Sequence, residues 1–132
     1  MMIVKTSVAP AGAKGLGVFA DESIKKGQVV WRYEEVFCRS FPDEQVQAME
    51  PLQREFMLKY STPEDGFWYL DLDNTRFMNH SDDNNVDFTD GWEPGVTVGI
   101  AQRDIAIGEE MTCDYRNLNV EPIFEGPKSC QS

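Results

Sequence analysis

The only histidine of the chain lies in a polar segment, residues 76–85, which is rich in groups that donate and accept hydrogen bonds. The segment reads Arg-Phe-Met-Asn-His-Ser-Asp-Asp-Asn-Asn. Buried amides and imidazoles need hydrogen-bond partners, so such a cluster marks either a tightly bonded turn or a polar pocket. A second segment, residues 108–115, ends a strand-like run at Tyr115. Together the two segments carry most of the functional signal.

The small-residue loop 9–17, with Gly15 and Gly17, is a third candidate for chemistry. A dinucleotide-binding loop would open a helix, but residues 21–27 are typical of a turn, and this excludes that class. Two alternatives stay open. The glycines let a ligand approach the backbone, or they serve a tight hairpin that needs positive φ, and the segment alone favours the hairpin.

Two acidic stretches resemble calcium loops, but their sixth positions hold Arg76 and Phe88 where a calcium loop needs glycine. We therefore expect no calcium site.

Composition indicates one folded domain. The chain has 132 residues, of which 41% are hydrophobic, and three cysteines without a CxxC pair, which suits a reducing compartment. We find no membrane span and no signal peptide, and we expect a soluble, intracellular, cytoplasmic protein.

The net charge of -11 argues against nucleic-acid binding. The acidity either keeps the protein soluble or steers basic peptides, and both alternatives stay open.

The elements that must position these groups are mainly short strands. The pattern predicts a turn at residues 62–66 and, from residue 116, an extended tail. Strands are expected at residues 3–8, 18–20, 28–37, 67–72, 86–89, 96–101 and 103–108. The strand 28–37 would bend near residues 33–35, and the strands 86–89 and 96–101 would form a hairpin. Helical spacing predicts a short helix and a better one within 40–60, whose stripe of Leu52, Phe56, Met57 and Tyr60 would pack on a sheet.

The order of three motifs resembles the SET-domain protein-lysine methyltransferases over roughly residues 4–116. These motifs are Gly15-Leu16-Gly17-Val18-Phe19-Ala20, then 76–81 with Asn85 four beyond the serine, then 108–115. The resemblance implies a mostly β fold: a SET-type β-clip of several small sheets, with a short helical insert at about 40–60 and a knot-like C-terminal threading. It implies a SET domain over residues 1–116 and a tail, 117–132, that closes the cofactor pocket.

The resemblance further implies an enzyme that uses S-adenosyl-L-methionine to methylate a lysine side-chain amine of a protein. Tyr115 would be catalytic. The cofactor would contact Lys14, Gly15, Leu16, Gly17, Asn79, His80 and, from the tail, Phe124. The substrate channel would be lined by Tyr33, Tyr60, Tyr69 and Cys113.

The residue types suit this chemistry, because the attacking amine must be neutral and aligned, and an apolar aromatic channel lowers the pKa of a lysine. The family usually has Phe or Tyr at the position of Cys113, which limits how many methyl groups fit. The smaller Cys113 would leave room for more than one methyl group, unless Tyr33, Tyr60 or Tyr69 fills the space. We expect no metal, because Asp82 follows Asn-His-Ser and only Cys130 follows Tyr115, which leaves no zinc site.

The expected partner is a basic protein or peptide that carries the target lysine, with no nucleic acid and no membrane, and the protein would be a monomer or homodimer. Two alternatives remain. One is a non-catalytic SET-like interaction module that still binds the cofactor, and the other is a methyltransferase with a non-lysine substrate.

Overall fold

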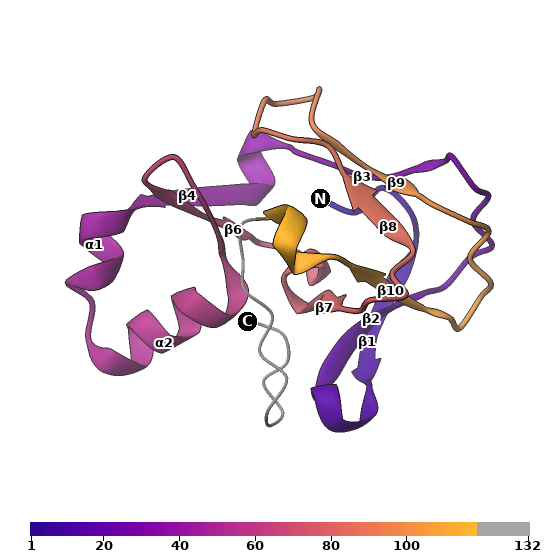
Figure 1. The fold of residues 1–132 in the computed structure, drawn as a ribbon, viewed down its shortest axis with the longest axis horizontal. Helices are drawn as coiled ribbons and strands as arrows, with labels where there is room; N and C mark the ends of the chain where they lie inside the picture. The colour runs from indigo at the N-terminus through magenta and orange to yellow at the C-terminus, as the bar shows by residue number, and fades with distance from the viewer. Residues whose placement is uncertain (119–132) are drawn as a thin grey trace.

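Three small sheets make up most of the structure, a computed structural model that describes residues 1–118 (Figure 1). The first sheet has the order β1 (Thr6–Pro10), β2 (Leu16–Ala20), β10 (Glu110–Cys113), β7 (Asn79–His80). The second has the order β3 (Val29–Arg32), β9 (Val98–Ala101), β8 (Val86–Phe88). The third has the order β4 (Cys38–Pro42), β6 (Phe67–Asp71), β5 (Thr62–Glu64). The predicted mostly β fold of several small sheets is confirmed, while the knot-like threading stays a prediction.

The loop around Gly15 closes a tight antiparallel hairpin, in which Ala9 pairs with Gly17 and Pro10 with Leu16. Gly15 has a φ of 85°, a left-handed conformation that favours glycine. The hairpin interpretation of this segment is therefore confirmed. The strand β2 also begins earlier than the predicted residue 18.

The central strand of the third sheet, β6, is the strand predicted at 67–72, but its two outer strands were missed from the sequence. Residues 38–42 form β4, which pairs with β6, and residues 62–64 form β5 instead of part of a turn. The turn is confined to Asp65 and Gly66, which have φ values of 51° and 82°. Pro42 ends β4 and Pro63 lies within the edge strand β5. Proline usually indicates the end of a strand, but edge strands tolerate it, so the two strands were not predicted. The expected strand at 103–108 reduces to one bridge between Ile24 and Ile105.

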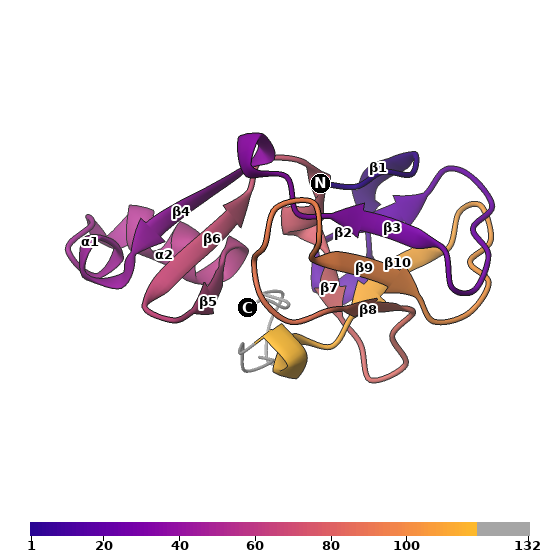
Figure 2. The same cartoon turned by 90° about the horizontal axis from the view of Figure 1, so that it is seen from above.

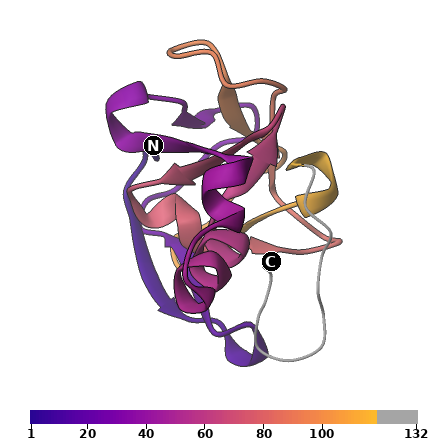
Figure 3. The ribbon, with the colours of Figure 1, turned by 90° about the vertical axis from the view of Figure 1, so that its left-hand side faces the viewer.

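The helical insert is present as α1 (Asp43–Gln47) and α2 (Pro51–Tyr60), and Pro51 begins α2 rather than interrupting a longer helix. With the third sheet, the helices extend to one side of the other two sheets (Figure 2), and they lie in front when viewed from that side (Figure 3). The predicted packing stripe is wrong in part, because Met57 is buried but Leu52 is 80% exposed and Phe56 is 44% exposed.

The core lies between the first two sheets. Its members include Val18 from β2, Val30 and Trp31 from β3, Ala101 from β9 and Met111 from β10. Residues 86–88 and 98–101 form the predicted antiparallel hairpin that completes this wall. The core thus holds β10 and its neighbour β7 rigidly, and these two strands carry both polar motifs of the sequence.

Candidate functional site

Parallel pairing of β7 with β10 brings the two polar motifs together. Thr112 pairs with Asn79 and Cys113 pairs with His80. The strands are short because β7 lies between a 3₁₀ turn at Asn74–Phe77 and the polar turn that follows His80. This pairing places His80 beside the end of the strand that leads to Tyr115.

His80 holds the backbone of Tyr115. The Tyr115 N–H donates to His80 Nδ1 at 3.1 Å, and His80 Nε2 lies 3.1 Å from Asp82 Oδ1. Because Nδ1 accepts a hydrogen bond, the neutral ring carries its proton on Nε2 and donates it to Asp82. The imidazole is only 4% exposed, so this pair of bonds fixes the ring. His80 therefore positions the tyrosine in addition to any contact with a ligand.

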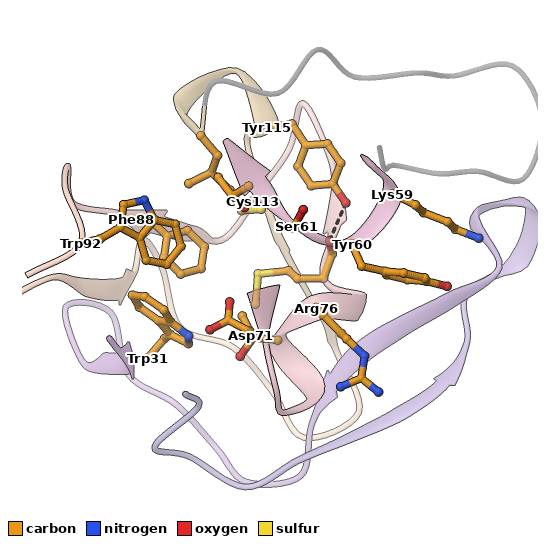
Figure 4. A pocket seen from close by; sticks show the side chains of 14 residues that line it. Trp31, Lys59, Tyr60, Ser61, Asp71, Arg76, Phe88, Trp92, Cys113 and Tyr115 are labelled. Atoms are coloured by element: carbon orange, nitrogen blue, oxygen red, sulfur yellow. Dashed lines mark hydrogen bonds between the residues drawn. The ribbon is translucent and has the colours of Figure 1, made fainter. Parts of the chain in front are cut away.

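The Tyr115 side chain is fixed as well. Its hydroxyl donates to the Met78 carbonyl at 2.7 Å (Figure 4). Its ring centroid lies 5.6 Å from that of His80. Asp114, next to it, is bound to Arg116, whose guanidinium holds the pKa of the Asp114 carboxyl below its ordinary value. The phenol thus has one orientation, with the adjacent backbone clamped on both sides.

Asn79 faces the opposite edge, toward the β1–β2 hairpin. Its Nδ2 donates to the Leu16 carbonyl at 2.9 Å and to Glu110 Oε2 at 2.8 Å. The other oxygen of Glu110 accepts from Lys14 Nζ at 2.8 Å. A chain of polar contacts therefore runs from Lys14 through Glu110 to Asn79, and Glu110 is the member that sequence reasoning missed.

Gly17 makes this arrangement possible. A Cβ at this position would lie 2.5 Å from Glu110 Oε2 and 3.1 Å from Asn79 Nδ2. The space beside Gly17 is therefore already filled by the side chains that position Asn79, and the need for glycine here comes from internal packing.

Asn85, which is 1% exposed, ties the polar turn to β10. Its side chain accepts from the Thr112 N–H at 2.9 Å and donates to the Glu110 carbonyl at 2.9 Å. Its backbone N–H donates to the Thr112 carbonyl at 3.1 Å. Asn85 thus makes the hydrogen bonds to β10 that a paired strand would make, in the turn that follows β7.

An aromatic pocket opens beside Tyr115 (Figure 4). Its lining comes from β3, the end of α2, β6, β8 and the segment 113–118. The residues that line it are Trp31, Lys59, Tyr60, Ser61, Thr62, Asp71, Thr75, Arg76, Met78, Phe88, Trp92, Cys113, Tyr115 and Leu118.

The structure brings together some of the predicted channel residues and separates others. Tyr60 and Cys113 line the aromatic pocket with Tyr115. Tyr69 stacks on Trp92 at 4.3 Å, and Tyr33 packs edge-on against the same indole at 5.3 Å, so these two tyrosines support the wall from behind. Burial raises the pKa of both phenols, which keeps them neutral.

The predicted cofactor residues Lys14, Gly15, Leu16 and Gly17 lie together at the hairpin, beside Asn79. His80 is the next residue of β7, on the side of Tyr115. Phe124 and Cys130 lie outside the described residues.

Several pocket residues were not predicted as site residues from the sequence, among them Trp31, Asp71, Phe88 and Trp92. Trp31 was interpreted only as a strand residue and Trp92 only as part of a turn, while Asp71 and Phe88 were considered as positions of calcium-like loops and set aside. A usable signal was the alternation of Trp31 with Tyr33 in the same extended segment, which puts both rings on one face.

Within residues 1–118, no group of three acidic, cysteine or histidine side chains has the geometry of a metal site. A search of the same residues for a helix long and apolar enough to cross a membrane finds none.

The fold and sequence match known proteins. A curated relative from Candida albicans, a histone-lysine N-methyltransferase described as H3 lysine-36 specific, is 30% identical over 142 residues. That match covers 96% of this chain but only 16% of the relative, so the chain spans about a sixth of that protein.

Two solved structures show the same fold. One is Polycomb Repressive Complex 2 of Chaetomium thermophilum, with a TM-score of 0.63 and 22% identity over 89% of this chain and 16% of that chain. The other is a Plasmodium falciparum protein described as a candidate histone methyltransferase, with a TM-score of 0.59 and 23% identity over 85% of this chain and 93% of that chain. Residues 15–116 match the family model described as SET domain, and they include β2 of the hairpin, both polar motifs and every residue that lines the aromatic pocket except Leu118. The chain therefore belongs to the SET-domain family.

Proposed function

We propose that this protein is a protein-lysine N-methyltransferase that uses S-adenosyl-L-methionine. The observation that carries the proposal is the fixed phenol of Tyr115, held by the Met78 carbonyl and by His80, at the wall of an aromatic pocket. A rigid, uncharged hydroxyl at the end of an apolar pocket suits a reaction in which a neutral amine must be aligned.

The residues at the hairpin fit the cofactor. Lys14 and Glu110 present a cation and an anion 2.8 Å apart, a pair that complements the zwitterionic amino-acid portion of S-adenosylmethionine. Gly15 and the 48%-exposed Leu16 lie next to them and leave backbone and apolar surface accessible. Lys14, Gly15, Leu16 and Gly17 would thus hold one side of the cofactor, and Asn79 and His80 the other. The bound cofactor supplies an electrophilic methyl group.

The substrate lysine would enter the aromatic pocket. Tyr60, Cys113 and Tyr115 line the pocket, and Tyr33 and Tyr69 back it through Trp92. Aromatic walls disfavour the ammonium form of the lysine and so increase the fraction of neutral amine. The Tyr115 hydroxyl, fixed on Met78, orients that amine. We propose that the SET domain spans residues 1–116 and that residues 117–132 close the cofactor side, with Phe124 as the contact.

The substrate we propose is a basic protein. The chain carries a net charge of -11, and the relative from Candida albicans is named for a histone lysine. Electrostatic attraction would concentrate a lysine-rich segment near the pocket. The competing function is an interaction module that binds the cofactor without transferring a methyl group.

The test combines binding with transfer. Calorimetry measures the affinity for S-adenosylmethionine, and transfer of a radiolabelled methyl group to core histones measures activity. We expect Tyr115→Phe to bind the cofactor and to lose about 100-fold or more in transfer, because the amine is no longer oriented. Tyr69→Phe is the matched control, since this phenol lies behind Trp92 and its loss should leave transfer unchanged.

Binding of the cofactor by the wild-type protein without transfer to any basic protein would favour the interaction module. Equal transfer by wild type and Tyr115→Phe would refute the role assigned to this tyrosine.

A further inference from the structure

Three buried polar atoms at the aromatic pocket have no hydrogen-bond partner among residues 1–118. They are Trp31 Nε1, Asp71 Oδ1 and Thr75 Oγ1. Buried polar groups are almost always paired, so an isolated exception needs an explanation. Three exceptions that all belong to residues lining one pocket point to a common missing partner, which must both donate and accept hydrogen bonds.

Asp71 gives this group its charge. It ends β6, pairs across the strand with Cys38, and keeps some exposure as a whole residue although its Oδ1 is shielded from water. The indole N–H of Trp31 lies beside the carboxyl without reaching hydrogen-bond geometry (Figure 4). A carboxylate in this position lacks the donors that would stabilise its charge.

Burial is the main cause that raises the pKa of Asp71, to about 7, and the neighbouring Asp73 adds to the rise. The groups that face this carboxyl are Asp73 and the Met1 ammonium, with the Cys38 thiol and the Tyr33 phenol on the packed strands. The cations Lys59 and Arg76 belong to the same pocket lining, but they form no ion pair with Asp71. The Met1 ammonium and the Trp31 indole N–H limit this rise in the pKa. The carboxyl thus changes its charge near neutral pH, and within residues 1–118 its Oδ1 has no hydrogen-bond partner of ordinary geometry.

The approach to this pocket is acidic. A neighbouring surface pocket shares Trp31, Thr62, Phe88, Trp92 and Leu118 with the aromatic pocket. It adds three carboxylates to the lining: Glu64, Asp65 and Asp90. A cationic side chain in the neighbouring surface pocket would therefore lie near three carboxylates. In the aromatic pocket it would find the Asp71 carboxyl, whose Oδ1 has no hydrogen-bond partner within residues 1–118.

We propose that Asp71 receives the ammonium group of the substrate side chain in the aromatic pocket and takes its proton, so that the neutral amine forms inside the protein. This inference rests on the proposed function, and it names a residue for a step that Tyr115 alone does not perform. Trp31 Nε1 and Thr75 Oγ1 are the other two groups around the site of this transfer.

The step is balanced. One N–H bond of the ammonium breaks, its electron pair stays on nitrogen as the lone pair, and the proton forms an O–H bond at Asp71 Oδ1. The ammonium loses its positive charge and the carboxylate its negative charge. After transfer, the protonated Asp71 returns its proton to solvent. The alternative is that a resident water bridges the three atoms. In that case, binding of a ligand in the pocket would not depend on its positive charge.

The first experiment is independent of methyl transfer. It uses n-butylamine hydrochloride as the probe, with 1-butanol as its neutral counterpart, and it follows binding by NMR. The wild-type protein should bind butylammonium about tenfold more tightly at pH 8 than at pH 6, because a carboxyl that titrates near pH 7 is ionised about tenfold more at the higher pH. Asp71→Asn should lose this preference, while butanol binding should be equal in both proteins.

The matched control is Asp73→Asn. Asp73 accepts from the Met2 and Thr75 N–H groups and so has a structural role close to Asp71. It should keep a preference for butylammonium that rises with pH, with its midpoint at a lower pH, because Asp73 adds to the raised pKa of Asp71. Equal butylammonium binding by wild type and Asp71→Asn, or no binding to the wild type at all, would overturn the proposal.

The second experiment is the pH dependence of kcat/KM for methyl transfer to core histones. With Asp71 as acceptor, kcat/KM should rise through pH 7 and level off above pH 8. In Asp71→Asn it should keep rising by up to tenfold per pH unit, because only the lysine that is already neutral can react. A variant with the wild-type plateau would refute the step. If the wild-type protein transfers no methyl group, the proposed function fails, and the butylammonium measurement still decides the role of Asp71.

Discussion

Gly17→Ala tests whether the close contact between the β1–β2 hairpin and Glu110 positions Asn79 and the hairpin residues that we propose to bind the cofactor. The new Cβ would lie 2.5 Å from Glu110 Oε2, whereas ordinary contact begins at 3.4 Å, so the carboxylate must move by about 0.9 Å. Its bond to Asn79 Nδ2 is 2.8 Å long and would stretch to about 3.7 Å, beyond hydrogen-bond range. The substitution therefore both overpacks the site and breaks a charged hydrogen bond.

The expected loss follows from these two effects. Overpacking costs about 1–3 kcal/mol, and a hydrogen bond to a charged group contributes about 1.5–3 kcal/mol. Because the side chain of Glu110 can relax in part, we expect the free energy of unfolding to fall by about 2–4 kcal/mol. Urea denaturation followed by circular dichroism measures this change, and calorimetry should show weaker binding of S-adenosylmethionine.

A double-mutant cycle with Glu110→Ala is the control. Removing the carboxylate removes the closest clash and leaves the contacts with Ala11 Cβ at 3.0 Å and Asn79 Nδ2 at 3.1 Å, so Gly17→Ala should cost at least about 1 kcal/mol less in the Glu110→Ala background than in the wild type. Costs that add within about 0.5 kcal/mol would show that the crowding at Gly17 has another origin, and the reasoning would fail.

Two further predictions concern stability. Asn85→Ala should lower the free energy of unfolding by about 2–4 kcal/mol, because it leaves the Thr112 N–H and the Glu110 carbonyl without their side-chain partner, and a loss below about 1 kcal/mol in urea denaturation would contradict this. Asp71 binds a proton more tightly in the folded than in the unfolded state, so its contribution to stability is complete below about pH 4 and is lost as the pH rises through about 7. The upper limit of that loss is about 4 kcal/mol, from about 3 pKa units at about 1.4 kcal/mol each. Relative to wild type, Asp71→Asn should therefore gain stability between pH 4 and pH 8, and parallel pH curves for the two proteins would rule this out.

Short-range patterns in the sequence were enough to predict much of the fold. The helices were visible because Pro42 and Pro51 precede runs of helical spacing, and the hairpin at 86–101 was visible because β-branched residues flank a turn-rich stretch. The two outer strands of the third sheet, β4 and β5, could not be predicted in this way. They are five and three residues long and contain proline, so local propensity is weak and pairing with β6 decides the structure.

The candidate site divides in the same way. Asn79, His80 and Tyr115 were identified because their motif resembles that of a family. Asp71 and Trp31 were not, because their significance depends on an absence of hydrogen-bond partners inside a pocket, which only coordinates reveal. Leu52 shows the opposite error: its spacing fits a buried helical face, but no sheet covers that part of α2, and the side chain stays 80% exposed.

The parallel contact between β7 and β10 has a consequence for the order of folding. Its partners Asn79 and Thr112 are 33 positions apart along the chain, and no local turn can bring them into register. Closing so long a loop is slow, and it must precede any contact of His80 with Tyr115. A nascent chain therefore gains the contact of His80 with Tyr115 only after its last strand, β10, has paired with both β2 and β7.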